Sequence, residues 1–302
     1  MLNSSIKTGE ELKEATTRVI VFFDLFDYPL TAYEVWKYLD KEAVLNEVVK
    51  ILDILSASGI INQENGFFFL PGRGEILTTR SLRHNYSLRK IKIARRFTRL
   101  FKILPAVKAV ILTNSIGQNN MRDGSDIDFL IITAPRRLWL TRLFCAGITK
   151  LANSRPTEKN KRDKICLSFY LSAENMNLDE FKLADGDPYF FYWLRSFVLL
   201  YNINDTYEQF LVANKLFLDA PIESNELKNI QFSSKSKFLN YLEKLAARLQ
   251  RVIMSESLKK AVNNSDGVVI NDRVLKLYLH DRRHEYAEKY GNRLRQVFAK
   301  ND

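Results

Sequence analysis

Two aspartates with the spacing of a metal site, Asp126 and Asp128, stand at the start of an apolar run. Side chains alternate between the two faces of a strand, so both carboxylates share one face while Ile127, Phe129 and Ile131 point into a core. Adjacent carboxylates repel each other unless a cation lies between them. Hard oxygen ligands suit Mg²⁺, which keeps several waters and also takes substrate phosphates as ligands. The pair therefore predicts a magnesium site on a strand.

A small polar turn precedes this strand. Asn114, Ser115 and Gly117 follow an apolar segment, Val107 to Thr113, which is predicted to be the preceding strand, and Ser125 comes directly before the first aspartate. The segment between the two strands is rich in Gly and Asn, which favour turns. We therefore expect the chain to turn back here, so that the two strands pair.

In this pattern the chain resembles the nucleotidyltransferase superfamily, which has the polymerase-beta-like fold. The family signature is a Gly-Ser turn after one strand, a spacer, and an Asp-hydrophobic-Asp motif that opens the next strand. Here Asn114 stands in place of the glycine, and its Cβ restricts left-handed backbone angles more than glycine does. The resemblance implies that Asp126 and Asp128 are the catalytic metal ligands, for one or two Mg²⁺ ions. It also implies a nucleotide-binding turn that consists of Asn114, Ser115, Gly117 and Ser125.

Members of this family often have a third carboxylate on a later strand. The matching segment, predicted as a strand over Lys164 to Leu171, contains no acid. Asp163 precedes it and Glu174 follows it, while Ser168 occupies the mid-strand place. The sequence thus leaves the third ligand open.

The activity that the resemblance implies is the transfer of a nucleoside monophosphate from a nucleoside triphosphate, with ATP as the first expectation, to a hydroxyl acceptor. The alternative is a catalytically weakened nucleotidyltransferase fold that serves as a nucleic-acid or protein-binding adaptor. The asparagine in the turn, the missing third acid and a long basic segment favour this alternative. The sequence does not identify the acceptor.

The composition is that of an ordinary water-soluble protein: 302 residues, 46% hydrophobic and 27% charged. No apolar run approaches the roughly 20 residues that span a bilayer, and the N-terminus lacks the apolar core of a signal peptide. We therefore expect a cytoplasmic location and no membrane partner. Cys145 and Cys166 lie in apolar surroundings and are interpreted as core residues. A net charge of +11 indicates an anionic partner.

The predicted fold class is α/β, of the α+β type, with a mixed sheet. We expect a lead-in at 1–15, a winged-helix-like domain at 16–74, a basic connecting helix at 75–105, a nucleotidyltransferase core at 106–175 and a helical domain at 176–302. Apolar periodicity over 189–201, 238–254 and 274–298 indicates the last of these. An Asn65-Gly66 turn indicates a hairpin, the wing. This arrangement also resembles bacterial nucleotidyltransferase-domain proteins with an N-terminal winged helix.

One long segment is basic. Residues 76–121 contain no Asp or Glu. The bases between 80 and 102 are Arg80, Arg83, Arg89, Lys90, Lys92, Arg95, Arg96, Arg99 and Lys102. Two interpretations are open: a phosphate-facing surface beside the active site that binds nucleic acid, or a solvated helix face. In contrast, the predicted recognition helix of the winged-helix-like domain carries more acids than bases, which disfavours DNA binding there.

Overall fold

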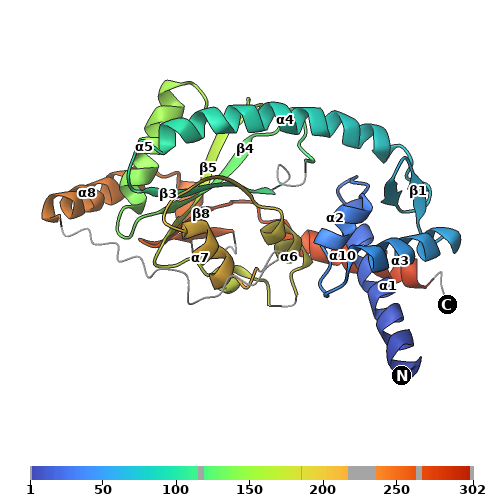
Figure 1. The fold of residues 1–302 in the computed structure, drawn as a ribbon. Coiled ribbons are helices and arrows are strands. Elements are labelled where there is room, and N and C mark those ends of the chain that lie inside the picture. Colours follow the sequence, from blue (N-terminus) through green and yellow to red (C-terminus); the bar gives the residue numbers. More distant parts are fainter. Residues whose placement is uncertain (1, 115–118, 185, 217–235, 263–266, 300–302) are drawn as a thin grey trace. The chain divides into compact units, whose positions relative to one another are not determined.

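A computed structural model describes residues 2–114, 119–184, 186–216, 236–262 and 267–299. The chain forms two compact units. The first consists of Met1–Asn85, Asp185–Tyr192 and Arg282–Asp302, and the second of Tyr86–Ala184 and Trp193–Asp281. The fold is of the α+β type with a mixed six-stranded sheet, as predicted (Figure 1).

The first unit begins with three helices and the predicted hairpin. The elements are α1 (Leu2–Asp24), α2 (Ala32–Lys37), α3 (Leu45–Ala57), β1 (Asn62–Glu64) and β2 (Phe67–Phe69). The hairpin turn has left-handed backbone angles at both Asn65 (φ 52°) and Gly66 (φ 78°). A two-residue type I′ turn requires this conformation at both positions, which is why the Asn-Gly pair predicts it.

An aromatic cluster and a buried acid hold the first unit together. Phe22 of α1 stacks on Tyr192 with ring centroids 4.0 Å apart. The carboxylate of Asp24, also on α1, accepts hydrogen bonds from Arg73 at 3.2 Å and from Arg293 at 2.7 Å. A buried carboxylate needs such partners because an unpaired buried charge is costly.

The second unit contains the sheet. Two helices, α4 (Ile76–Phe101) and α6 (Pro188–Arg195), are shared between the two units. The other elements of the second unit are β3 (Val107–Leu112), β4 (Ile127–Thr133), α5 (Leu138–Leu151), β5 (Ile165–Ser172), η2 (Asp179–Phe181), β6 (Val198–Asn202), α7 (Thr206–Ala213), α8 (Lys237–Ile253), α9 (Glu256–Ala261), β7 (Val268–Ile270) and β8 (Val274–Leu277). The strand order is β6-β3-β4-β5-β8-β7. Among the described strands, only β4 and β5 pair in parallel, because helix α5 carries the chain back between them.

The predicted helical domain over 176–302 is wrong in two respects. Three strands from this region, β6, β7 and β8, belong to the sheet. The last helix, α10 (Arg283–Phe298), belongs to the first unit, where Tyr290, Leu294 and Val297 pack against the cluster around α1. Short apolar strands and buried helix segments have similar patterns, so periodicity alone does not separate them. Strand β6 pairs with β3 at the edge of the sheet, and this pairing depends on contacts between distant segments of the chain.

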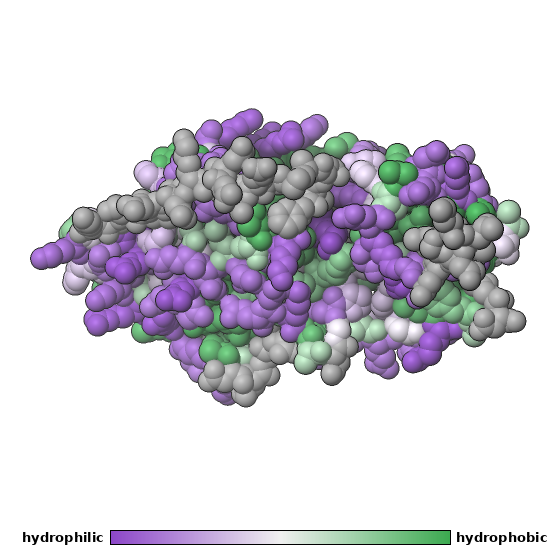
Figure 2. Space-filling view, turned by 60° about the horizontal axis from the view of Figure 1, so that its bottom comes forward, coloured by the Kyte–Doolittle hydropathy of each residue, from purple (hydrophilic) through white to green (hydrophobic). Residues whose placement is uncertain are grey.

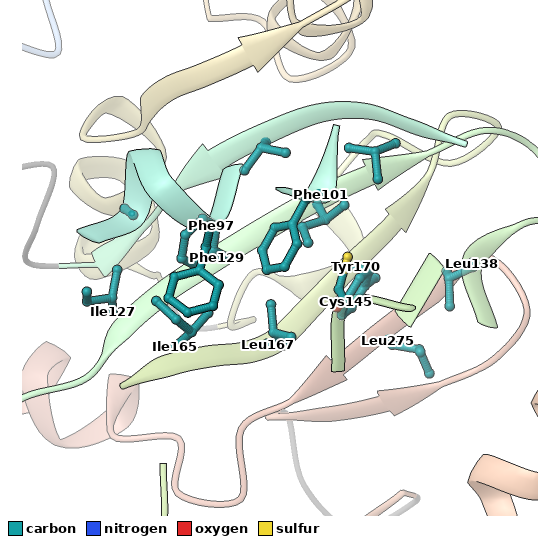
Figure 3. Close-up of a cluster of buried hydrophobic side chains, with 14 of the residues drawn as sticks. Phe97, Phe101, Ile127, Phe129, Leu138, Cys145, Ile165, Leu167, Tyr170 and Leu275 are labelled. Carbon is teal, nitrogen blue, oxygen red and sulfur yellow. The ribbon is translucent and has the colours of Figure 1, made fainter. Parts of the chain in front are cut away.

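The apolar core of the second unit lies on one face of the sheet. Helices α4 and α5 supply Phe97, Phe101 and Cys145, among other residues, and β4 supplies Ile127 and Phe129 (Figure 3). The ring of Phe101 meets that of Phe129 edge-on, with centroids 5.7 Å apart. Because side chains alternate along β4, residue 128 faces the other side of the sheet.

On the face seen in Figure 2, hydrophilic side chains predominate, and apolar residues show between them. Among the described residues, none of the helices combines the length and the apolar character that a membrane crossing needs.

Candidate metal centre

Three polar side chains form a row across neighbouring strands. The backbone N–H of Thr113, at the end of β3, donates to the carbonyl oxygen of Asp128 on β4 at 3.2 Å. On the other side, Asp128 lies opposite Cys166 of β5 in the parallel register. Residues directly opposite each other on adjacent strands share a face of the sheet. All three side chains therefore lie on the face away from α4 and α5.

Asp126 joins this row at the start of β4. One potential ligand atom from each of Asp126, Asp128 and Cys166 lies within 4.8 Å of those of the other two. We call these three residues the metal triad. The structure thus brings together the two aspartates that the sequence predicts as metal ligands. It adds a third residue, Cys166, which the sequence analysis interpreted as part of the core.

Negative charges lie close together in the metal triad. Burial, together with the neighbouring charge of Asp126, raises the pKa of Asp128 to about 6, against hydrogen bonds from Asn114 and Cys166 that act to lower it. Burial and the two carboxylates also raise the pKa of the Cys166 thiol well above its usual value. A divalent ion between these groups would offset the repulsion.

The turn after β3 explains the asparagine in the predicted glycine position. Asn114 has φ 62°, in the left-handed region. Asparagine adopts this region more readily than most non-glycine residues. Its side-chain oxygen accepts a hydrogen bond from the indole N–H of Trp193 at 2.8 Å. Its amide group then faces the carboxylate of Asp128, to which it hydrogen-bonds. Asn114 thus fixes the orientation of a triad carboxylate.

The other predicted nucleotide contacts have different outcomes. Ser115 and Gly117 lie outside the described residues, so their contacts with a nucleotide stay predictions. Ser125 uses its hydroxyl within its own turn, where it donates to the carbonyl of Arg122 at 2.9 Å. Its carbonyl oxygen accepts a hydrogen bond from the ammonium group of Lys90 at 2.6 Å.

None of the three residues considered as a third ligand belongs to the metal triad. Asp163 pairs with Lys90 at 2.9 Å and with Arg89 at 3.0 Å. Although burial acts to raise it, these hydrogen bonds hold the pKa of Asp163 below its usual value. Ser168 accepts a hydrogen bond from the Cys166 thiol at 3.3 Å, and Glu174 is exposed beyond the end of β5.

Two buried hydroxyls beside the triad have no hydrogen-bond partner. They belong to Thr113 and Tyr278. The hydroxyl of Tyr278 lies near those of Thr113 and Ser168. Burial raises its pKa well above the usual value, and the charges of Asp128 and Cys166 add to this effect. A hydroxyl is both a donor and an acceptor, so these two side chains can form hydrogen bonds with a polar group beside the triad.

Comparison of the chain with family models, curated proteins and solved structures gives no match. A function for the metal triad therefore has to be inferred from its geometry and from the chemistry of its donor atoms.

The basic residues of α4, with Lys102 directly after its end, fall into two groups. Four of them are paired within the protein: Arg80 with Glu34, Arg83 with Asp27, and Arg89 and Lys90 with Asp163. Five others are exposed, and no ion pair is found for them among the described residues: Lys92, Arg95, Arg96, Arg99 and Lys102. Their spacing of three and four residues puts them on one helix face. We call these five residues the basic stripe.

The basic stripe does not line the metal triad, contrary to one of the two interpretations of the sequence. The inward face of α4 packs through Phe97 and Phe101 against the sheet face that carries Phe129. The triad residue Asp128 is on the opposite face of the sheet. A phosphate bound to the stripe would therefore be separated from the triad by the helix and the sheet.

Proposed function

We propose that this protein is a metal-dependent nucleotidyltransferase, which transfers a nucleoside monophosphate from a nucleoside triphosphate to a hydroxyl acceptor. One observation carries the proposal: the grouping of Asp126, Asp128 and Cys166 within 4.8 Å on adjacent strands, next to the left-handed turn at Asn114. A divalent ion bound there would neutralise phosphate charge and lower the pKa of the acceptor hydroxyl. The two carboxylates supply the oxygen ligands that such an ion needs.

The surrounding residues have roles that suit this chemistry. Asn114 orients the carboxylate of Asp128 and is itself held by Trp193. Trp193 in turn stacks on Phe169 of β5, with an interplanar angle of 13°. The unpartnered hydroxyls of Thr113 and Tyr278 offer two donors to an oxygen of the bound substrate. We expect the triphosphate to bind beside Asn114 and the metal triad, with ATP as the first candidate.

Calorimetry tests this proposal. Wild type should bind at least one nucleoside triphosphate in the presence of a divalent ion and should lose this binding when the ion is removed. The Asp126→Asn, Asp128→Asn double variant should bind the same nucleotide at least 10-fold more weakly, because the isosteric amides keep the fold but remove the negative charge that holds the ion. Equal binding by both forms would contradict the proposal.

A second candidate function is a nucleic-acid-binding adaptor built on a catalytically weakened fold. The specific observation that favours it is the basic stripe, whose five exposed bases lie on one face of α4. Bases arranged in this way neutralise successive phosphates and release counterions, which makes the affinity salt-dependent. The metal triad holds two carboxylates and no third one, which fits the same function.

Charge reversal separates this second candidate from the first. Arg95→Glu, Arg96→Glu and Arg99→Glu together should weaken RNA or DNA binding at least 10-fold and lower the salt dependence by about one per lost phosphate contact. A matched control reverses three exposed lysines elsewhere: Lys159, Lys161 and Lys244. Fluorescence anisotropy at several salt concentrations measures both sets. Equal losses would indicate general charge attraction, and no binding by wild type at low salt would remove the nucleic-acid adaptor.

A further inference from the structure

The sulfur of Cys166 is placed by strand pairing rather than by a loop. Two successive parallel pairs, Ile127 with Ile165 and Asp128 with Cys166, align β4 and β5 at this point. A bulge follows directly, since the next pair is Leu130 with Phe169. Bulges often occur beside functional sites, where they redirect side chains. The thiol therefore has a fixed position beside the carboxylates, and its sequence neighbours on β5, Ile165 and Leu167, face the apolar core.

The distances between the three donor atoms are compatible with the binding of one ion by all three. They lie within 4.8 Å of one another. Around a tetrahedral ion with metal–oxygen bonds of about 2.0 Å and a metal–sulfur bond of about 2.3 Å, the donors lie roughly 3.5 Å apart. The three donors are therefore close enough together for one ion to bind all of them.

An independent observation points to a ligand at the same place. Thr113 is 0% exposed and its hydroxyl has no hydrogen-bond partner. It lies next to Asp128 across the β3–β4 pair, on the same face of the sheet. The buried hydroxyl of Tyr278 nearby is also unpartnered. Two such orphan hydroxyls beside the triad fit a water or phosphate oxygen that occupies the open position of a bound ion.

The donor set does not match the ion that the family resemblance implies. Mg²⁺ takes oxygen ligands in near-ideal octahedral geometry, and a thiol cannot take the place of a carboxylate for it. Thiolate ligands instead select ions such as Zn²⁺, and a site with three protein ligands leaves a fourth position for water or substrate.

We infer that the metal triad binds Zn²⁺ in preference to Mg²⁺, with Cys166 as a thiolate ligand beside the carboxylates of Asp126 and Asp128. The proton displaced from the sulfur passes to the buffer when the ion binds. The inference rests on the proposed function only in its use of the same two aspartates. It assigns Cys166 a role in binding, in contrast to Cys145, which is buried in the core on the other face of the sheet.

Cobalt spectroscopy on the full chain tests this inference without an activity assay. Metal-free wild type titrated with Co²⁺ should develop a sulfur-to-cobalt charge-transfer band that saturates at one equivalent. Zn²⁺ should displace the Co²⁺, whereas a 100-fold excess of Mg²⁺ should not. Cys166→Ser should lose the band and bind Zn²⁺ at least 10-fold more weakly, while Cys145→Ala, the matched control, should keep both. Circular dichroism checks that each variant is folded.

Each outcome is informative. A band that survives in Cys166→Ser, or displacement of Co²⁺ by equimolar Mg²⁺, would overturn the inference. If calorimetry shows that wild type and Cys166→Ser bind Zn²⁺ equally, and bind a triphosphate equally in its presence, the thiolate ligand is excluded while the proposed function stands. If neither Co²⁺, Zn²⁺ nor Mg²⁺ binds to folded wild type, the inference and the metal-dependent function both fail.

Discussion

Replacement of Lys90 by alanine is expected to destabilise the sheet-bearing unit by about 3–5 kcal/mol, the usual effect of removing one partner of a buried ion pair. The side chain of Lys90 is 0% exposed. Its ammonium group donates to the carboxylate of Asp163 at 2.9 Å and to the carbonyl oxygens of Asp123 at 3.0 Å and Ser125 at 2.6 Å. An ammonium group has three donors, and Lys90 uses all of them. Its loss leaves three acceptors without this partner.

Lys92, two residues along the same helix, provides the matched control. It is exposed and belongs to the basic stripe, so Lys92→Ala should change the stability by less than about 0.5 kcal/mol. Urea unfolding followed by circular dichroism measures both variants. A loss of less than about 1 kcal/mol in Lys90→Ala, or equal losses in the two variants, would show that Lys90 does not stabilise the turn before Asp126.

Asp128→Asn is expected to stabilise the metal-free protein at neutral pH while it destroys the metal centre. The pKa of Asp128 is raised from 3.8 to about 6, so folding favours its protonated form. The stability that this group contributes is fully present below pH 4 and is lost as the pH rises through 6. A shift of this size corresponds to about 3 kcal/mol at pH 7. Asparagine has no charge to bury and avoids this loss.

Thermal unfolding at several pH values measures this effect. In the absence of metal, Asp128→Asn should be more stable than wild type at pH 7.5, and the difference should disappear near pH 4. A saturating divalent ion should stabilise wild type, because it binds only the folded form, and should leave Asp128→Asn almost unchanged. A variant that is less stable than metal-free wild type at pH 7.5 would contradict the burial of an uncompensated charge at this position.

Local sequence patterns predicted the elements around the metal triad. The strands β3 and β5 and the helix α4 lie within a few residues of their predicted ranges, and β4 begins next to Asp126 as predicted. The reason is that each has a clear apolar period, with turn residues such as Asn114 at its ends. The same patterns placed Asp126 and Asp128 on one face of a strand, next to each other. These features depend on short stretches of chain, so one sequence is sufficient to infer them.

The features that the sequence missed depend on contacts between distant segments. Cys166 became a triad member because β4 and β5 pair in parallel with Asp128 opposite it, and register is a tertiary property. The sequence contains one weak indication that Cys166 lies beside Asp128. A polar or reactive residue follows an isoleucine in both Ile127-Asp128 and Ile165-Cys166. Likewise, the pairing of Lys90 with Asp163 joins residues 73 positions apart. Because of this ion pair, Asp163 is not available as a third metal ligand, and Lys90 is not part of an exposed basic surface.

The most direct test of the metal triad as a centre that binds a cation and a nucleotide together is anomalous diffraction. Crystals grown with Zn²⁺ and a non-hydrolysable nucleoside triphosphate should show an anomalous peak between the side chains of Asp126, Asp128 and Cys166, with the triphosphate beside it. An ordered nucleotide bound elsewhere, with no anomalous peak at these three residues, would contradict this account.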